Sequence, residues 1–366
     1  MAGLYIHIPF CKSRCIYCAF YSTTSHELRQ RYVDAVCREW QLRSRELSAP
    51  VTTVYLGGGT PSQLTPQQLQ QLLTALPPSA PEVTVEANPD DITVKYAAIL
   101  SQLGINRVSM GAQTFDDRRL RFLHRRHTSA QVAQAVQHLR EAGIRNISID
   151  LMYGFPDETL EDWERDIDAA LALNVEHISA YCLTVEEGTA LYRMNVETVG
   201  EELEREMYYL LKDKLEAAGF EHYEISNFAR PGYRSRHNSS YWQDVPYIGL
   251  GAAAHSYDGK RRSWNVADIR QYIAAVERGE RPYEEETLDE DTWYNDRITT
   301  ALRTREGLDL TALPEKYRRY CLKEARRYIE QRWLAERDGH LALTRDGLFV
   351  SDDIMSSLIY IYINKV

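Results

Sequence analysis

Three cysteines lie within eight residues of the segment His7-Ile8-Pro9-Phe10-Cys11-Lys12-Ser13-Arg14-Cys15-Ile16-Tyr17-Cys18-Ala19-Phe20. The segment follows an apolar run, Leu4–Ile8, that predicts the first strand. The spacing C-x3-C-x2-C puts three thiolates on one short loop, enough to bind three irons of a [4Fe–4S] cube and to leave the fourth iron without a protein ligand nearby. A zinc site usually takes four ligands, and a redox pair takes one C-x-x-C. The spacing therefore favours a cluster, and a structural metal site remains the alternative.

The cysteine spacing, with Tyr17 just before the last cysteine, resembles the cluster loop of the radical S-adenosylmethionine (SAM) superfamily. In that superfamily the open iron takes the amino and carboxylate groups of SAM, and an electron from the cluster cleaves the sulfonium to give a 5′-deoxyadenosyl radical. The resemblance implies a [4Fe–4S] cluster and SAM as cofactors. It also implies that Cys11, Cys15 and Cys18 are the metal ligands.

Length and composition indicate a globular protein of 366 residues, with 44% hydrophobic and 26% charged residues. This length suits one barrel of roughly 200–250 residues plus an appendage. A net charge of −10 disfavours nucleic acid as the main partner, because phosphate binding needs a basic surface. The chain shows no signal-peptide pattern and no apolar run of about 18 residues. We therefore expect a cytoplasmic protein whose other three cysteines, Cys37, Cys182 and Cys321, are reduced.

Short β-type runs alternate six times with longer helical patterns. The expected strands are Leu4–Ile8, Val51–Leu56, Glu82–Ala87, Arg107–Met110, Ile147–Met152 and His177–Cys182. The expected helices are Ser25–Leu47, Pro66–Leu76, Ile92–Leu103, Ala130–Ala142, Leu160–Leu173 and Glu201–Ala218. Six successive β-α units imply a parallel sheet with right-handed crossovers. The sequence thus predicts an α/β fold, a partial (β/α)6 radical SAM barrel.

Unusual residues follow the predicted strands, at the rim where a parallel barrel places its chemistry. Gly57-Gly58-Gly59-Thr60-Pro61 follows the second strand, Glu86 ends the third, Gln113 follows the fourth and Asp150 lies in the fifth. Glycines let the backbone approach a ligand and pair with the ends of an amino acid. A carboxylate at a strand end is costly to bury unless it is satisfied, and a ribose diol would satisfy it. The alternative is that these acids cap loops or pair with arginines, Arg107 or Arg125.

The glycine turn together with the cysteine loop resembles one branch of the superfamily, which contains oxygen-independent coproporphyrinogen III dehydrogenase and the heme chaperone family called HemW. The resemblance covers essentially the whole chain. It implies that the SAM-binding residues are Tyr5, Gly58, Gly59, Thr60, Glu86, Gln113, Arg125 and Asp150.

Two departures separate these sister families. The dehydrogenase has a further cysteine two residues beyond the third, where Phe20 stands in this chain. It also has an N-terminal extension of several dozen residues before the barrel strand, which begins here at residue 4. Both departures favour the heme chaperone. A dehydrogenase, that is, a SAM-dependent oxidoreductase acting on a porphyrinogen, is the alternative.

A second motif, Arg236-His237-Asn238-Ser239-Ser240-Tyr241-Trp242, matches the HNxxYW signature of the heme chaperone family. A histidine beside aromatic side chains offers an imidazole for heme iron and flat rings for a macrocycle. We therefore predict His237 as the heme ligand, flanked by Tyr241 and Trp242, with His255 as the second choice. The alternative is an aromatic segment that covers the barrel, with His237 bonded to a backbone carbonyl.

The last part of the chain predicts a small α+β unit like a winged helix. A charged stretch over residues 277–286 is expected to be a solvated connector. The elements expected after it are helices over Asp291–Thr304 and Pro314–Arg332, a strand over Leu341–Thr344 and a helix over Asp352–Ile363. The predicted domains are 1–225 for the barrel, 226–286 for the HNxxYW loop region and connector, and 287–366 for the winged-helix-like unit.

The expected partners follow from the resemblance and from the charge. They are heme, an unidentified heme-acceptor protein and an electron donor such as a flavodoxin, with no nucleic acid. Peripheral membrane association and the choice between monomer and homodimer are left open.

Overall fold

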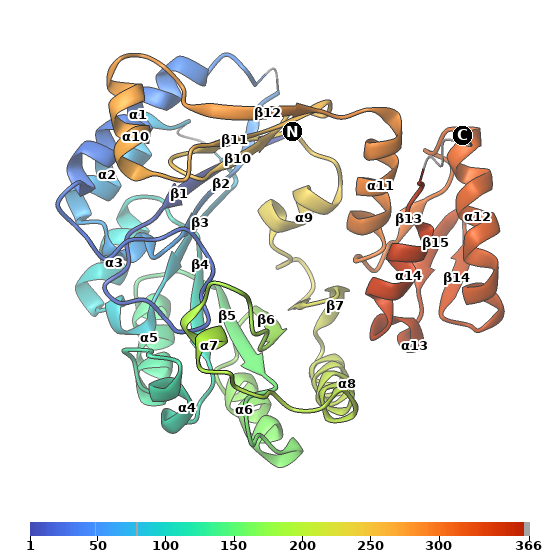
Figure 1. Ribbon diagram of the computed structural model, residues 1–366. Coiled ribbons are helices and arrows are strands. Elements are labelled where there is room, and N and C mark those ends of the chain that lie inside the picture. Colours follow the sequence, from blue (N-terminus) through green and yellow to red (C-terminus); the bar gives the residue numbers. More distant parts are fainter. Residues whose placement is uncertain (48, 78–79, 362–366) are drawn as a thin grey trace.

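Strand β1 (Ala2–Ile8) lies in the middle of a large sheet in the computed structural model, which describes residues 1–47, 49–77 and 80–361 (Figure 1). It pairs in parallel with β2 (Val51–Gly58) on one side and with β9 (Tyr247–Leu250) on the other. Six of its seven residues are buried, as expected for a strand covered on both faces. The strand order is β12-β11-β10-β9-β1-β2-β3-β4-β5-β6-β8-β7.

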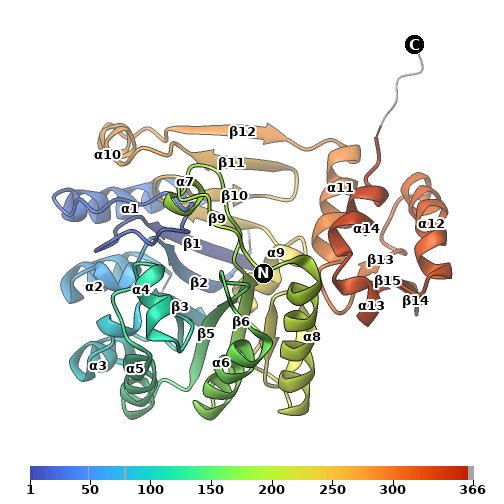
Figure 2. The same cartoon turned by 60° about the horizontal axis from the view of Figure 1, so that its bottom comes forward.

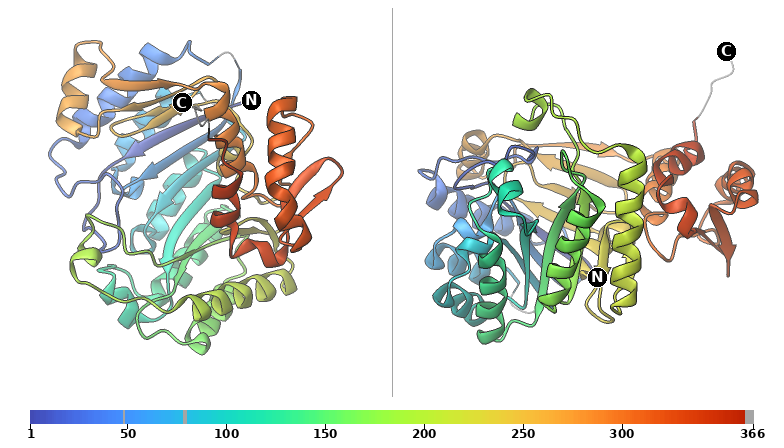
Figure 3. Two further views of the ribbon diagram at one scale, coloured as in Figure 1. Left: turned by 45° about the vertical axis from the view of Figure 1, so that its right-hand side comes forward. Right: turned by 90° about the horizontal axis from the view of Figure 1, so that it is seen from below.

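Strands β1 to β6 run parallel and in sequence order, and helices cover their outer side (Figure 3). The remaining strands of this group are β3 (Glu82–Ala87), β4 (Arg107–Gln113), β5 (Asn146–Tyr153) and β6 (His177–Cys182). The helices are α1 (Arg29–Arg43), α2 (Pro66–Ala75), α3 (Val94–Gln102), α5 (Ser129–Glu141), α6 (Leu160–Ala172) and α8 (Glu201–Ala217). The predicted partial (β/α)6 barrel is confirmed, because each predicted run forms the expected element.

Local signals explain where several of these helices begin. Thr65 and Thr159 each form a capping box, in which the threonine side chain accepts from the third helical residue and that residue's side chain accepts from the threonine backbone. Two short helices that the sequence did not predict, α4 (Asp117–Phe122) and α7 (Ala190–Arg193), lie in the loops after β4 and β6. They are four to six residues long, too short to carry a periodic pattern.

The sheet extends beyond β1 by four strands, which lie in the part of the chain, residues 226–286, that was predicted as the HNxxYW loop region and connector. The additional elements are β7 (Glu221–Glu224), β8 (Asn227–Ala229), α9 (Arg236–Trp242), β10 (His255–Tyr257), β11 (Arg261–Asn265), α10 (Ile269–Glu277) and β12 (Tyr283–Thr287). All five residues of β12 are exposed, and its glutamates lie opposite β11. An exposed edge strand of this composition lacks the alternating apolar pattern by which strands are recognised.

The C-terminal unit lies to one side of the large sheet (Figure 2). It has a separate hydrophobic core around Tyr294 and Leu341. Its elements are α11 (Glu290–Ala301), β13 (Leu308–Asp309), α12 (Glu315–Glu330), β14 (Leu334–Arg337), β15 (His340–Leu343), α13 (Arg345–Leu348) and α14 (Ser351–Leu358). Positive φ angles of 51° and 78° at Asp338 and Gly339 form the tight turn of the β14–β15 hairpin. Helix α14 ends at Leu358, so the predicted helix Asp352–Ile363 is too long over residues 359–361, and its last two residues lie outside the described part of the chain. The predicted domain limits stay predictions.

Among the described residues, no helix is both long enough and apolar enough to cross a lipid bilayer.

Candidate cluster and cofactor site

The cysteine loop runs from the end of β1 to α1 and is fastened at three points. The backbone N–H of Cys11 donates to the Thr23 carbonyl at 2.9 Å, which closes the loop on itself. The backbone N–H of Ile16 donates to Leu123 at 3.3 Å, and its carbonyl accepts from Leu191 at 2.9 Å. The Ile16 side chain is 3% exposed and packs in a small apolar cluster beneath the loop. The loop is therefore held between the rim segments that follow β4 and β6.

The three loop cysteines are free thiols that differ in their surroundings. Cys11 is buried and accepts a hydrogen bond from the Thr60 hydroxyl at 3.5 Å, whereas Cys15 accepts one from Arg125 Nη1 at 3.7 Å. Burial raises the pKa of the Cys11 and Cys18 thiols, and each is raised further by neighbouring loop cysteines. The loop thus brings the three sulfurs near one another.

Within the described ranges, no three His, Cys, Asp or Glu side chains converge to hold a single metal ion. In a [4Fe–4S] cube each cysteine binds a different iron, so its ligands do not meet at one point. The arrangement of the loop is therefore compatible with a cluster.

The glycine turn after β2 comes so close to the cysteine loop that no side chain fits at its third glycine. A Cβ atom on Gly59 would lie 3.0 Å from Cys11 Sγ and 2.8 Å from the Pro9 carbonyl carbon. Gly58 has φ +112°, and a Cβ there would lie 2.7 Å from the His7 ring. The glycines thus allow the backbone of this turn to pass directly beside the predicted cluster ligands.

Glu86 lies at the end of β3 with its carboxylate facing the glycine turn. The Tyr55 hydroxyl donates to Glu86 Oε1 at 2.7 Å, and the Gly58 N–H donates to Oε2 at 3.1 Å. Burial raises the pKa of Glu86 to about 7, opposed by the hydrogen bond from Tyr55, while Asp150 raises it further. An acid held in this state has hydrogen-bonding capacity left for a diol.

Asp150 and Arg125 continue the arc of polar groups across β4 and β5. The Ser109 hydroxyl donates to Asp150 Oδ1 at 3.4 Å, and burial raises the pKa of this carboxyl. Arg125 donates to the Gly111 carbonyl at 2.5 Å. Gln113 has φ +66°, and a Cβ on Gly111 would lie 2.5 Å from the Gln113 amide nitrogen. The structure therefore brings the predicted rim residues together on one side of the sheet.

Arg107 lies below this arc and was not predicted as a site residue. It is 1% exposed, and its Nε and Nη1 atoms have no hydrogen-bond partner among the described residues. Its charge lowers the pKa of both Glu86 and Asp150, but no ion pair joins it to either carboxylate in the described part of the chain. The predicted alternative, a direct pairing of these acids with Arg107 or Arg125, is therefore not observed. Only its position in an otherwise apolar strand could have marked Arg107 in the sequence.

Tyr5 and His7 form the floor of the same site on β1. The Tyr5 hydroxyl and His7 Nδ1 lie 3.0 Å apart, and His7 Nε2 lies 3.0 Å from the Tyr21 carbonyl. The Tyr5 ring stacks on Tyr55 with 6.2 Å between centroids. His7 and Tyr55 were not predicted, although both alternate with apolar residues in their strands, as side chains on the inner face of a barrel do.

His237 lies beside Tyr5, near the beginnings of β1 and β2, and is fully buried, at 0% exposure. Its Nδ1 bonds with Thr53 Oγ1 at 2.8 Å, and its Nε2 bonds with the Tyr241 hydroxyl at 2.8 Å. The ring stacks on Tyr55 at 5.1 Å. Burial lowers the pKa of His237 to about 3.

This geometry does not support the sequence-based choice of His237 as the heme ligand, because both ring nitrogens are already bonded. The predicted alternative for the motif, a satisfied histidine in a segment that covers the barrel, agrees better with the structure. Its bonding partners differ from that prediction, since they are hydroxyl groups and not a backbone carbonyl.

Comparison with known proteins places this arrangement in a family. Residues 5–170 match the radical SAM superfamily, and residues 288–350 match the HemN C-terminal domain. The heme chaperone HemW of Bacillus subtilis is 38% identical over 335 residues, covering 87% of this chain and 88% of that protein. The chain belongs to the heme chaperone HemW family.

Further HemW relatives extend the match over nearly the whole chain. The protein of Mycobacterium tuberculosis is 35% identical and covers 98% of this chain and 94% of its own. The protein of Escherichia coli is 34% identical over 69% of each chain. Among solved structures, the coproporphyrinogen III oxidase HemN of Escherichia coli shares the fold, with a TM-score of 0.84 at 21% identity, over 98% of this chain and 90% of that one.

Membership of the radical SAM superfamily implies that the protein binds a [4Fe–4S] cluster and SAM. The residues of the site fit both groups. The three free thiols leave no fourth cysteine in the loop, as a cluster with one exchangeable position requires. The rim offers an orphaned Arg125 Nε, a raised-pKa carboxyl at Glu86 and a cradle that a Cβ on Gly59 would fill. These are donors and acceptors that an amino acid and a ribose would satisfy.

Proposed function

We propose that this chain is a heme chaperone that holds a [4Fe–4S] cluster, binds SAM beside it and passes heme to an acceptor protein. The observation that carries this proposal is the match to HemW heme chaperones over nearly the full length of the chain. Phe20, whose side chain is 69% exposed, stands where the dehydrogenase branch has its further cysteine, and this difference supports the same function.

The residues of this chain have distinct roles in the proposed function. Cys11, Cys15 and Cys18 hold the cluster, which supplies one-electron chemistry and an open iron for the methionine end of SAM. The predicted SAM contacts are Tyr5, Gly58, Gly59, Thr60, Glu86, Gln113, Arg125 and Asp150. The backbone of the glycine turn pairs with the amino acid end of SAM, and Glu86 accepts from the ribose hydroxyls. A carboxylate that accepts from an uncharged donor gains about 1.5–3 kcal/mol of binding free energy.

Arg125 serves both cofactors in this proposal, because one guanidinium nitrogen donates to Cys15 Sγ and another to the Gly111 carbonyl. The Thr60 hydroxyl has the corresponding place beside Cys11.

The second candidate function is an oxidative decarboxylation of a porphyrinogen by radical SAM chemistry. The specific observation in its favour is that the polar arc around Glu86 and Asp150 is complete, as a SAM-cleaving enzyme would need. The fold shared with HemN is compatible with either function and does not choose between them.

One experiment separates the two candidates. The protein is reconstituted anaerobically with iron and sulfide, titrated with heme, and incubated with coproporphyrinogen III, SAM and a reductant. We expect one heme per chain with a Soret band and no release of carbon dioxide. Decarboxylation without heme binding would show that the chain is a dehydrogenase and not a heme chaperone.

The remaining partners belong to this proposal as expectations. The heme acceptor is a protein still to be identified, and the cluster would take electrons from a donor such as a flavodoxin in the cytoplasm. Size-exclusion chromatography with light scattering decides between monomer and homodimer, and flotation with liposomes tests a peripheral membrane association.

A further inference from the structure

The strands that extend the sheet beyond β1 present an inner face that continues the floor of the cofactor site. Tyr5 of β1 lies beside Gly249 of β9, and Tyr247 lies beside Tyr257 of β10. Because side chains alternate between the two faces of a sheet, His255 shares the face of Tyr257, two residues further along β10. In Figure 1 these strands form one arm of the curved sheet, whose hollow side faces α9.

His255 therefore faces the same space as Tyr5, at a similar level along the barrel. A Cβ atom on Gly249, the strand neighbour of Tyr5, would lie 2.0 Å from the His255 carbonyl oxygen. His7 lies two residues beyond Tyr5 on β1 and shares its face of the strand. His7 belongs to the floor of the proposed SAM site.

The side chain of His255 is exposed, and neither ring nitrogen forms a hydrogen bond within the described ranges. Its ring stacks on Trp264, the opposite residue on β11, with 6.0 Å between centroids and 28° between planes. The free imidazole is thus supported on one side by a broad aromatic surface. This combination offers a nitrogen ligand for iron whose ring is held in place by an aromatic neighbour.

The other histidines are less suited to take a ligand from this space. His7, His177 and His237 have both ring nitrogens bonded and are buried. Each of five others either has one ring nitrogen bonded to a backbone carbonyl or lies away from the inner face of the extension: His26, His127, His138, His222 and His340. His124 is exposed, and it lies at the end of α4 on the other side of the barrel mouth.

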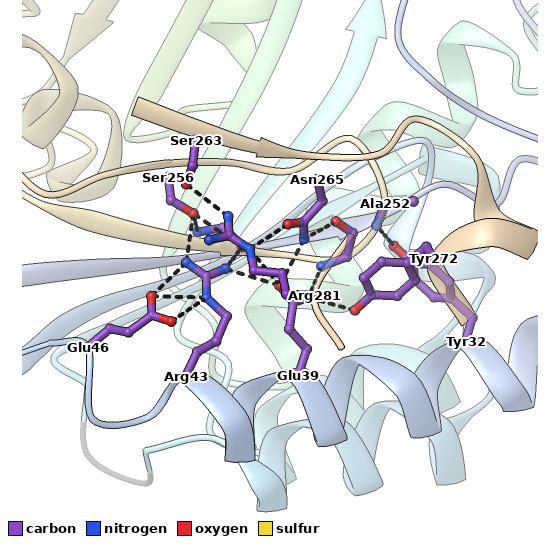
Figure 4. A network of polar contacts seen from close by, with 12 residues as sticks. Tyr32, Glu39, Arg43, Glu46, Ala252, Ser256, Ser263, Asn265, Tyr272 and Arg281 are labelled. Atoms are coloured by element: carbon purple, nitrogen blue, oxygen red, sulfur yellow. Dashed lines mark hydrogen bonds and ion pairs between the residues drawn. The ribbon is translucent and has the colours of Figure 1, made fainter. Parts of the chain in front are cut away.

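The rear of the extension is held rigidly by a buried polar network (Figure 4). Ser256, the neighbour of His255 that points to the outer face, bonds with Gly249 N–H at 3.0 Å and accepts from Arg43 Nη2 at 3.1 Å. Arg43 pairs with Glu39 at 3.0 Å, and both side chains are almost fully buried. The Glu39 carboxylate also accepts from Gly251 N–H and from the Asn265 side chain, at 2.9 and 2.8 Å.

This network ties β9, β10 and β11 to α1 from behind. The backbone that carries His255 on the inner face is consequently fixed relative to the strand that carries Tyr5 and His7. A ligand that binds His255 would therefore have a fixed position relative to the SAM site.

We propose that the iron of heme is bound by the imidazole of His255 on the inner face of β10 and β11, with Trp264 holding the imidazole ring in its orientation. This inference rests on the proposed chaperone function and names its heme site. In this inference the HNxxYW motif, which lies in α9, has a structural role, and His237 positions Tyr55 beneath Glu86.

The test uses the full chain, reconstituted anaerobically and titrated with ferric heme. We expect His255→Ala to bind heme at least about tenfold more weakly, a loss of about 1.4 kcal/mol of binding free energy, with a shifted Soret band. Added imidazole should restore the wild-type band position, which a purely structural defect would not allow. Trp264→Leu should weaken binding but keep the band position, because it leaves the iron ligand in place.

Two control variants make the test specific. His124→Ala removes another exposed imidazole near the barrel mouth and should leave the titration unchanged. His237→Gln should keep the wild-type Soret position while it lowers stability. Iron content and SAM binding of His255→Ala should equal those of the wild type, which verifies that the variant is folded.

The outcomes separate this inference from the function on which it rests. A wild-type protein that binds no heme overturns both. A wild type that binds heme, together with a His255→Ala variant of unchanged band position and affinity, overturns the His255 site alone. A Soret band that disappears in His237→Gln but persists in His255→Ala would show that His237 in the HNxxYW motif, and not His255, is the iron ligand.

Discussion

The buried imidazole of His237 gives a sharp prediction about stability and pH. His237→Gln keeps a polar group near the Tyr241 hydroxyl but cannot also reach Thr53, which is itself 3% exposed. An unsatisfied buried hydroxyl costs about 1–3 kcal/mol, so the free energy of unfolding should fall by that amount near pH 7.5.

The pH dependence follows from the pKa of about 3 that burial imposes on His237 in the folded state. In the unfolded chain a histidine has a pKa near 6.5. Between these values the unfolded state binds a proton that the folded state cannot bind, so this contribution to stability is complete above about pH 6.5 and is lost as the pH falls. The loss is about 1.4 kcal/mol between roughly pH 7.5 and 5.5.

Because glutamine does not titrate, the gap in unfolding free energy between wild type and His237→Gln should narrow by about 1.4 kcal/mol over that pH range. Urea denaturation of the metal-free protein, followed by tryptophan fluorescence and circular dichroism, measures the gap. His124→Gln is the matched control at an exposed position and should stay within about 0.5 kcal/mol of the wild type. A gap that does not change with pH would refute the reasoning that His237 is held neutral between Thr53 and Tyr241.

Three further predictions concern the cofactors and the sheet extension. Cys15→Ala should lose the cluster, so anaerobic iron and sulfide analysis that still found about four irons per chain would contradict the assignment of the cluster to this loop. Glu86→Gln should weaken SAM binding by about 1.5–3 kcal/mol in calorimetry. The raised pKa of Glu86, about 7, means that its ionisation reduces stability as the pH rises from about 4.5 through 7, so near pH 8 the variant should unfold at the same or a higher temperature than the wild type. Glu39→Gln should cost about 1.5–3 kcal/mol in denaturant unfolding, because it removes the buried charge that accepts from Arg43 and the Gly251 N–H, although Arg43 keeps its ion pair with Glu46; a loss below about 1 kcal/mol would show that the Glu39–Arg43 pair in Figure 4 is not needed for the fold.

The β-α units were predictable because their signals are local. Each strand of the barrel is a short apolar run, and the helices carry both periodicity and caps such as Thr65. The rim residues could be named as well, because the carboxyl ends of parallel strands meet at one edge. The cysteine spacing needed no long-range information at all.

The extension β9 to β12 could not be predicted, because its pattern depends on neighbours far away in sequence. Tyr247–Leu250 is a short, glycine-containing run that becomes a strand only through pairing with β1. The surroundings of the two candidate heme ligands, His237 and His255, could not be predicted either, because they also depend on residues far away in sequence. His237 is satisfied by Thr53, 184 residues earlier, and His255 faces inward only by virtue of the register between β9 and β10.

The acidic edge strand β12 has a consequence for how copies of this protein meet. Its outer backbone groups are a template on which another strand could add, yet Glu284, Glu285 and Glu286 all lie there exposed. A second copy that paired edge to edge in an antiparallel manner would bring six carboxylates together along one ladder, and like charges opposite each other oppose such pairing. The protein can therefore leave this edge of the sheet open and still resist fibrous association through it.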